Sequence, residues 1–326
     1  MRGISSYNEK NFVAVFEFNF LYTLRAFCVK IILDFCVILT MICERATDGA
    51  DVEYTNKGKL SEMFDLPEGF PYLYETHMHT KEASACAKES AIDMVRAYKK
   101  AGYRGLFVTN HNWGGNTCVD RGLCWREWID KYFEPYYRMK EWGDKNDFDV
   151  FCGMETGYGG PEFLIYGLEP EFWYAHPELL EASIEDQYKI IHEGGGLVIH
   201  AHPMRRAWYI DRIELFPDYV DGVEGLNASH SSPYSQSHNN KEYNDEALLY
   251  AKEHNFIITG GSDCHSVNIL YGGMAFRRCL ADGNDFCNIL RKYMSLGNKE
   301  DVVNKEYDYL VTDAVCWYTP YGDVLK

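Results

Sequence analysis

Residues 70–84 read FPYLYETHMHTKEAS and place two histidines, His77 and His79, at the end of a run that is typical of a β-strand. On a strand, residues two apart point to the same face, so the two imidazoles are expected side by side. Two parallel imidazoles suit a metal ion well and a packed core poorly. The stretch therefore predicts a strand and, at its carboxyl end, part of a metal site.

The chain continues from this stretch as an alternation of strands and helices. Strand-like runs are separated by helix-like patterns at 90–102, 126–143, 183–196 and 244–255, and the runs themselves cover 72–79, 103–110, 148–155, 162–168, 197–203, 220–227 and 256–265. This alternation indicates an α/β protein with a mostly parallel sheet, open or closed into a barrel. The sequence has no G-x-G-x-x-G fingerprint and no Walker loop, which disfavours nucleotide-binding folds.

Charge and cysteine content narrow the partners and the compartment. The net charge is -17 over 326 residues, and an acidic surface repels a phosphate backbone, so no nucleic-acid partner is expected. A small anionic substrate remains compatible, because a local metal cluster can outweigh the global field. The 11 cysteines form no C-x-x-C pair, which favours reduced thiols and a cytoplasmic location.

The first fifty residues differ from the rest of the chain. Residues 1–50 are apolar and aromatic with interspersed charges, and their clean apolar run at 35–43 is shorter than the roughly 20 residues that span a bilayer. Three interpretations stay open: a leader or anchor that contacts a membrane, a helix packed on the main domain, or an extension outside the functional unit. We therefore expect two parts, the extension at 1–50 and a main domain at 51–326.

Metal-type side chains follow the carboxyl ends of the expected strands, where parallel α/β sheets build their sites. They are His77, His79, His111, Glu155, His200, His202, Asn227, His230, Asp263 and His265. Imidazole and carboxylate without thiolate fit Zn, Mn or Fe. The number of ligands exceeds the need of one ion, so a cluster of two or three ions is expected.

Several pairs and single residues carry more specific expectations. The pairs His77/His79, His200/His202 and Asp263/His265 share the i, i+2 spacing, which should aim both members at one face. Glu155 is the isolated carboxylate on a middle strand and the expected bridge between ions. Cys264 should point away and pack, and a structural role is expected for His176, His192, His238 and His254.

The order of these motifs resembles the PHP (polymerase and histidinol phosphatase) superfamily. The chain shows HxH at 77–79, then Thr109-Asn110-His111, Gly-Met-Glu at 153–155, Ala-His-Pro at 201–203 and a late Ser-Asp-Cys-His at 262–265. The resemblance covers roughly residues 72–290. It implies an α/β fold, namely a distorted (β/α)7 TIM-like barrel of the PHP type that binds two or three divalent metal ions.

The resemblance also assigns ligands, residue by residue. It implies a first metal held by His77, His79, Glu155 and Asp263. A second would be held by Glu155 and His202 together with His230, and a third by His111 and His265. Arg205, just after the Ala-His-Pro motif, matches a family arginine that meets the phosphate.

Two departures from the family pattern concern the third metal. Asn110 stands where members often carry an aspartate, and Asn110 supplies no negative charge. Members also often have Ser-Asp shortly after the HxH, where this chain reads Glu-Ala-Ser-Ala-Cys at 82–86.

The function that the resemblance implies is a metal-dependent phosphoesterase that hydrolyses a small phosphomonoester. Two metals about 4 Å apart would supply a hydroxide for attack on phosphorus in line. Arg205 would stabilise the phosphoryl oxygens, and Asp263 or His265 would pass a proton to the leaving alcohol. The alternatives are a metallo-amidohydrolase and a non-catalytic metal-binding protein of the same fold.

Two loops are expected to border the pocket. The stretch 113–128, which follows His111, contains Trp113, Trp125 and Trp128. Two roles stay open for these tryptophans: stacking on a substrate ring, or buried packing. The polar loop 229–240 is the other expected rim element.

Overall fold

The computed structural model describes residues 66–296 and 306–325 of the chain. Within them, the strands form one sheet in the order β10-β9-β8-β1-β2-β3-β4-β5-β6-β7. These strands are β1 (Tyr72–Glu75), β2 (Gly105–Val108), β3 (Asp149–Gly157), β4 (Glu162–Tyr166), β5 (Leu197–His200), β6 (Gly222–Asn227), β7 (Ile257–Gly261), β8 (Gly273–Phe276), β9 (Tyr309–Thr312) and β10 (Trp317–Tyr318). The expectations for residues 1–50, including the boundary at 50/51, lie outside the described residues.

The sheet is mixed and curls on itself. The pairs β1–β2, β2–β3, β5–β6 and β6–β7 are parallel, whereas β4 is antiparallel to both of its neighbours. A parallel bridge between Met78 and Cys264, just past the ends of β1 and β7, brings the two sides of the curl together. The α/β class and the barrel-like shape are thus confirmed. The count of seven βα units is not, because β3 and β4 form a hairpin without a helix between them.

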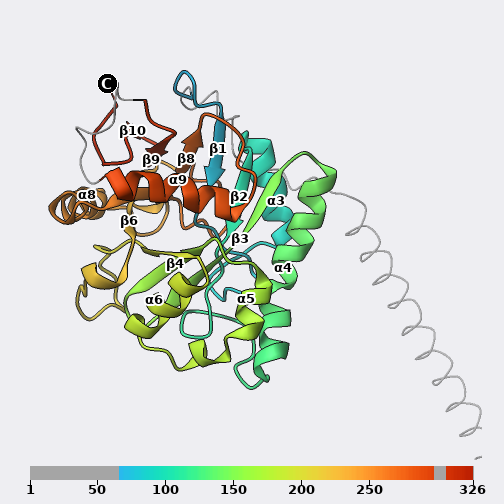
Figure 1. Cartoon of the computed structure of the whole chain (residues 1–326). Coiled ribbons are helices and arrows are strands. Elements are labelled where there is room, and N and C mark those ends of the chain that lie inside the picture. Colours follow the sequence, from blue (N-terminus) through green and yellow to red (C-terminus); the bar gives the residue numbers. More distant parts are fainter. Residues whose placement is uncertain (1–65, 297–305, 326) are drawn as a thin grey trace, which may run out of the picture. The chain divides into compact units, whose positions relative to one another are not determined.

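Helices connect most of the strands and cover the sheet (Figure 1). They are α3 (Ala91–Ala101), α4 (Trp125–Lys145), α5 (Pro170–Ala175), α6 (Ile184–Glu193), α7 (Ala228–Ser231), α8 (Glu242–His254) and α9 (Gly283–Leu296), with 3-10 turns η1 (Pro177–Leu180) and η2 (Pro217–Tyr219). Hydroxyl caps begin two of the predicted helices: Ser90 accepts from the Asp93 amide, and Ser183 accepts from the Asp186 amide. Gly102 ends α3 in the left-handed conformation that glycine adopts readily.

An aromatic core fills the inside of the curl beneath the strand ends. Phe107 of β2 lies 5.2 Å from Tyr166 of β4 and 4.7 Å from Phe286 of α9, measured between ring centroids, and all three are fully buried. The Tyr166 hydroxyl donates to the backbone oxygen of Thr76 at 2.8 Å. The core therefore fixes the backbone directly before His77.

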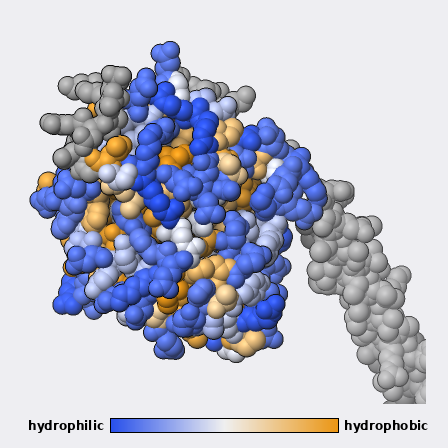
Figure 2. Space-filling model, in the orientation of Figure 1, coloured by the Kyte–Doolittle hydropathy of each residue, from blue (hydrophilic) through white to orange (hydrophobic). Residues whose placement is uncertain are grey.

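Within residues 66–296 and 306–325, no helix is both long enough and apolar enough to cross a membrane. The face of the molecule seen in Figure 2 is mainly hydrophilic, with apolar residues in small separate patches.

Replacing Phe107 by alanine is expected to lower the free energy of unfolding by about 3–5 kcal/mol, because the cavity left between three elements cannot collapse fully. Urea unfolding followed by circular dichroism measures this loss. The control is Leu249→Ala on α8, where the side chain is 57% exposed and the expected loss is below about 1 kcal/mol. Equal losses for the two variants would contradict this account of the core.

Candidate metal centre

The ends of β1 and β7 bring together three of the four ligands predicted for the first metal. The His79 amide donates to the Cys264 oxygen at 2.9 Å, so the chain past β1 runs beside the chain past β7. His77 and His79 are wholly buried, and their Nε2 atoms lie 3.2 Å apart. Asp263 Oδ1 lies 3.0 Å from His79 Nε2 and 3.4 Å from His77 Nε2. These three side chains thus lie together as the prediction of a first metal site requires.

The outer nitrogens of these two rings fix their protonation. His77 Nδ1 lies 2.9 Å from Glu224 Oε1, which accepts its proton. His79 Nδ1 lies 3.0 Å from Ser84 Oγ, whose own hydroxyl donates to Asn110 Oδ1. Each ring therefore turns Nε2 toward the other ring and toward two carboxylates. Two carboxylates and two Nε2 atoms in one buried space require positive charge among them, and a divalent ion fits this set.

Glu155 of β3 lies at the centre of the cluster and is wholly buried. Its Oε1 is 3.2 Å from both His77 Nε2 and His202 Nε2. Its Oε2 is 3.3 Å from His79 Nε2 and 2.8 Å from His111 Nδ1. Each carboxylate oxygen thus faces a different pair of histidines, which is the geometry of a bridging ligand.

The charges of the cluster shift one another. Burial lowers the pKa of His77, but the carboxylates of Glu224, Glu155 and Asp263 outweigh burial and raise it well above its usual value. Burial raises the pKa of Asp263, but Arg205 and His77 hold it well below its usual range. Asp263 is therefore ionised at neutral pH and suited to hold a cation.

A second group of ligand atoms includes a residue that the sequence analysis missed, Glu162. This side chain lies 3.5 Å from His202 Nε2 and 3.6 Å from His111 Nδ1. Glu162 is the first residue of β4. Because β4 runs antiparallel to β3, its first residue lies at the edge where the parallel strands end. The short glycine-rich connection at 157–161 is the signal that predicts such a hairpin.

A third group joins His79, His111 and His265. The centroid of the His79 ring lies 4.4 Å from each of the other two ring centroids, which lie 6.4 Å from each other. Cys86 Sγ lies 3.0 Å from His265 Nε2. Burial raises the pKa of the Cys86 thiol, but hydrogen bonds with His111 and His265 outweigh burial and lower it to about 7.

Two buried atoms of the cluster, Glu155 Oε2 and His111 Nδ1, lie 2.8 Å apart and make no hydrogen bond of good geometry with any described residue. Buried polar atoms are rarely left so, because the lost hydration is costly. The donor set of imidazoles and carboxylates, with these two atoms left without a well-formed hydrogen bond, fits divalent metal ions.

The pair His200/His202 does not behave as predicted. His202 lies past the end of β5 with a positive φ of 30°, which breaks the alternation of a strand. His200 stacks on Phe163 at 4.9 Å, away from the cluster. The prediction that these two side chains share one face is therefore wrong. Asp263 also has a positive φ, 53°, and backbone strain of this kind is frequent at functional sites.

The structure does not bring His230 into the cluster. Its Nδ1 lies 2.9 Å from Asn244 Oδ1, and its Nε2 accepts from Arg205 Nε at 3.1 Å. Both ring nitrogens are thus engaged by protein groups. The ligand role of His230 stays a prediction that would require it to give up Arg205.

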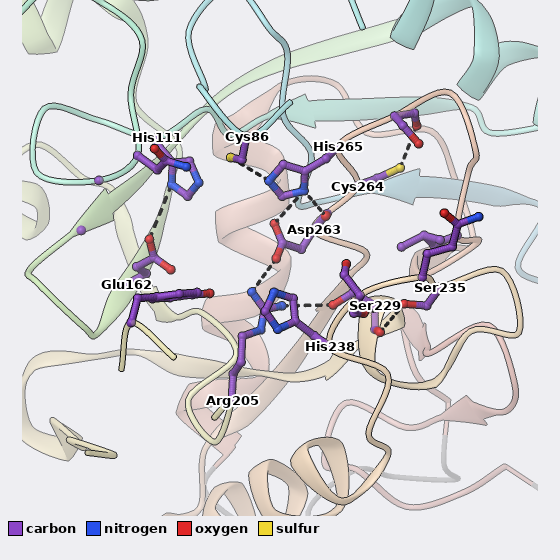
Figure 3. A pocket seen from close by; sticks show the side chains of 18 of the residues that line it. Cys86, His111, Glu162, Arg205, Ser229, Ser235, His238, Asp263, Cys264 and His265 are labelled. Atoms are coloured by element: carbon purple, nitrogen blue, oxygen red, sulfur yellow. Dashed lines mark hydrogen bonds and ion pairs between the residues drawn. The ribbon is translucent and has the colours of Figure 1, made fainter. Parts of the chain in front are cut away.

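Arg205 is buried and fixed beside the cluster. Its guanidinium donates to Asp263 Oδ2 at 2.6 Å and to Ser229 Oγ at 3.1 Å (Figure 3). The relative exposure of Arg205 is only 3%, so its guanidinium is not a solvated surface group. Its neighbour Arg206 is the exposed one and pairs with Glu246.

An open cavity of about 690 Å³ adjoins the cluster. Its wall includes His111, Glu162, Arg205, Asp263 and His265, so the cluster faces solvent on this side (Figure 3). The polar loop expected at the rim does line it, through residues 234–238. The exposed Trp208 and its neighbour Tyr209 form another part of the wall.

The remaining sequence expectations concern packing. Trp113 lies 4.8 Å from Trp125 and 5.4 Å from Trp128, so the three tryptophans pack together rather than line the cavity. Cys264 is buried as predicted. His176, His192 and His254 lie outside the cluster, where they contact Glu178, Asp221 and Tyr250, whereas His238 lines the cavity.

Comparison with known proteins supports this interpretation of the fold. No protein-family model and no curated protein matches the chain. A two-domain protein from Bacteroides vulgatus, which contains a predicted PHP-like metal-dependent phosphoesterase, matches with a TM-score of 0.52 at 12% identity. The match covers 75% of this chain and 66% of that one, so the chain spans just under two thirds of that protein.

Two further solved structures match less well. An amidohydrolase from Chromobacterium violaceum has a TM-score of 0.38 at 14% identity, covering 59% of this chain and 87% of that one. Endonuclease Q in complex with a 27-mer duplex has a TM-score of 0.44 at 11% identity, covering 68% of this chain and 56% of that one. The chain has the PHP-like fold, and the resemblance predicted from its ordered motifs is confirmed at the level of the fold.

The expectation that nucleic acid is excluded as a partner is wrong. Among the structures that match, Endonuclease Q is in complex with a duplex that has an abasic lesion at the active site, which conflicts with that expectation. The physical error lies in the use of net charge, which averages over the whole surface. Metal ions and a local arginine set the field at a site of this kind.

Replacing Glu155 by glutamine is expected to weaken binding of Zn²⁺ or Mn²⁺ by at least about 100-fold, because the bridging negative charge is lost at constant shape. Calorimetric titration of the chelated protein measures the affinity. Glu178→Gln, which removes an exposed carboxylate paired with His176, is the matched control and should bind as the wild type does. Unchanged affinity and stoichiometry in Glu155→Gln would contradict the central role of this carboxylate.

Proposed function

We propose that this chain is a metal-dependent hydrolase of phosphoric esters and that its substrate is a small phosphomonoester. The observation that carries the proposal is the meeting of His77, His79, Glu155 and Asp263, whose ligand atoms lie 3.0–3.4 Å apart. Buried donor atoms at this spacing suit divalent ions, and the adjoining cavity gives a substrate access to them.

The cluster would hold at least two ions, one on each side of Glu155. His77, His79 and Asp263 surround one side, and His202, His111 and Glu162 surround the other. Metal ions in such an arrangement polarise a phosphoryl oxygen and lower the pKa of water toward about 7.

Arg205 supplies fixed positive charge at the cavity wall. Three of the five N–H groups of its guanidinium are held by Asp263, Ser229 and His230, so the group is oriented before a substrate arrives. A preoriented guanidinium stabilises charge on phosphoryl oxygens without reorganising during the reaction. We propose this role for Arg205.

Asp263 and His265 are proposed as metal-holding rather than proton-donating groups. One oxygen of Asp263 faces the two histidines and the other accepts from Arg205, and its low pKa leaves it without a proton at neutral pH. His265 donates from Nδ1 to the Asp263 backbone oxygen at 2.7 Å, which leaves Nε2 as its only lone pair. The leaving alcohol would then take its proton from solvent in the open cavity.

The size of the cavity supports a small substrate. A space of about 690 Å³ accommodates a drug-sized molecule, and its wall carries cationic, aromatic and polar groups rather than apolar groups alone. The amidohydrolase alternative has no observation of its own in this site, because Glu155 occupies the bridging place that such enzymes fill with a lysine.

The test is phosphate release by the purified full chain with Mn²⁺ or Zn²⁺. Its panel contains phosphomonoesters, phosphodiesters, duplex DNA with and without an abasic site, and amides. We expect hydrolysis of monoesters, lost on chelation and reduced at least about 100-fold in His77→Ala.

The matched control is His176→Ala, since His176 lies outside the cluster and pairs with Glu178. It should retain wild-type rates. If a folded, metal-loaded chain hydrolyses only diesters, DNA or amides, the monoester assignment fails. If it hydrolyses nothing in the panel, the non-catalytic alternative replaces the proposal.

A further inference from the structure

Cys86 lies where the sequence pattern leaves the third metal group without an acidic ligand. It stands in the loop between β1 and α3 and faces the cavity beside His265 (Figure 3). Its Sγ is 3.0 Å from His265 Nε2. The ligand atoms of His265, His111 and His79 lie within 4.8 Å of one another. Cys86 is thus a fourth donor beside an existing group of three.

The neighbouring imidazoles are oriented as metal-binding histidines are. His265 Nδ1 donates to the Asp263 backbone oxygen at 2.7 Å, and therefore the lone pair of Nε2 points at Cys86. Metal-ligating histidines usually donate their other N–H to a carbonyl or carboxylate in this way. His111 is oriented in a comparable way, because its Nδ1 lies 2.8 Å from Glu155 Oε2, which leaves Nε2 as the ring nitrogen that can meet a further ligand.

The loop that carries Cys86 is firmly held. The Ala85 amide donates to the Asn116 oxygen at 2.9 Å, and the Lys88 amide donates to the His265 oxygen at 2.9 Å. Ser84 Oγ, two residues before the thiol, contacts His79 Nδ1 and accepts from the His111 amide. The same loop thus positions the thiol and orients two histidines of the cluster.

We propose that Cys86 is a thiolate ligand that completes a third metal subsite with His111 and His265. The subsite takes a borderline-soft divalent cation, Zn²⁺ or Fe²⁺, in preference to Mn²⁺ or Mg²⁺, because thiolate favours softer metals. The inference rests on the proposed metal centre and adds to it a metal preference that imidazoles and carboxylates alone do not set. It concerns binding only, so it can be tested without turnover.

The test uses cobalt as a spectroscopic probe on the full chain. The chelated protein is titrated with Co²⁺, and the near-ultraviolet band that arises from thiolate-to-cobalt charge transfer is recorded. We expect the band in the wild type and its loss in Cys86→Ser. Cys118→Ser is the matched control and should keep the band. The Cys118 thiol is exposed and lies near the same loop, where it contacts the Lys81 backbone oxygen.

A parallel Zn²⁺ titration measures the number of sites. Cys86→Ser should lose one equivalent, or weaken the last equivalent at least about tenfold, while the remaining sites bind as before. Cys86→Asp should restore that equivalent with Mn²⁺ favoured, because a carboxylate is a harder ligand. This second variant distinguishes loss of a ligand from loss of fold.

Two outcomes overturn the inference. One is a wild type that binds Co²⁺ without the charge-transfer band, and the other is a band that persists in Cys86→Ser. Either result, combined with metal-dependent phosphate release, leaves the proposed function standing and removes only the thiolate ligand. A charge-transfer band that depends on Cys86, in a chain without phosphatase activity, supports the thiolate ligand and removes the proposed function.

Discussion

The site depends on one constraint, a carboxylate buried among histidines. Glu155 is wholly removed from solvent, and four imidazoles approach its two oxygens at 2.8–3.3 Å. A buried charge is costly unless it is paired and hydrogen-bonded. Imidazole N–H groups satisfy part of this charge, yet a second carboxylate, Asp263, and the Nε2 atoms of His77 and His79 crowd the same buried space. A divalent cation removes both conflicts at once.

The fold places the partners of this buried carboxylate around it by joining distant strands at one edge. The parallel bridge from Met78 to Cys264 brings the ends of β1 and β7 together, and a second parallel bridge joins His111 to Glu155. Beneath them, the aromatic core of Phe107, Tyr166 and Phe286 supports the backbone before His77. Residues nearly two hundred positions apart thus meet within hydrogen-bonding distance.

The sequence predicts the parts of the site that depend on strand ends. His77, His79, His111, Glu155, His202, Asp263 and His265 are found together because parallel strands place their carboxyl ends at one edge. Glu162 escapes this rule, since it begins an antiparallel strand, and Glu224 escapes it because it lies inside β6 and orients His77 from behind. His200 fails because the strand alternation ends before His202. Local backbone geometry of this kind is set by tertiary contacts, which the hydrophobic periodicity of a sequence does not predict.

The central claim is that Glu155 and its histidines hold divalent metal ions. X-ray diffraction at the absorption edge of zinc or manganese, from crystals of the metal-loaded full chain, tests it most directly. The account predicts an anomalous peak among the donor atoms of His77, His79, Glu155 and Asp263, and a second peak on the His202 side of Glu155. Peaks found only elsewhere, or none while these side chains keep their arrangement, would contradict it.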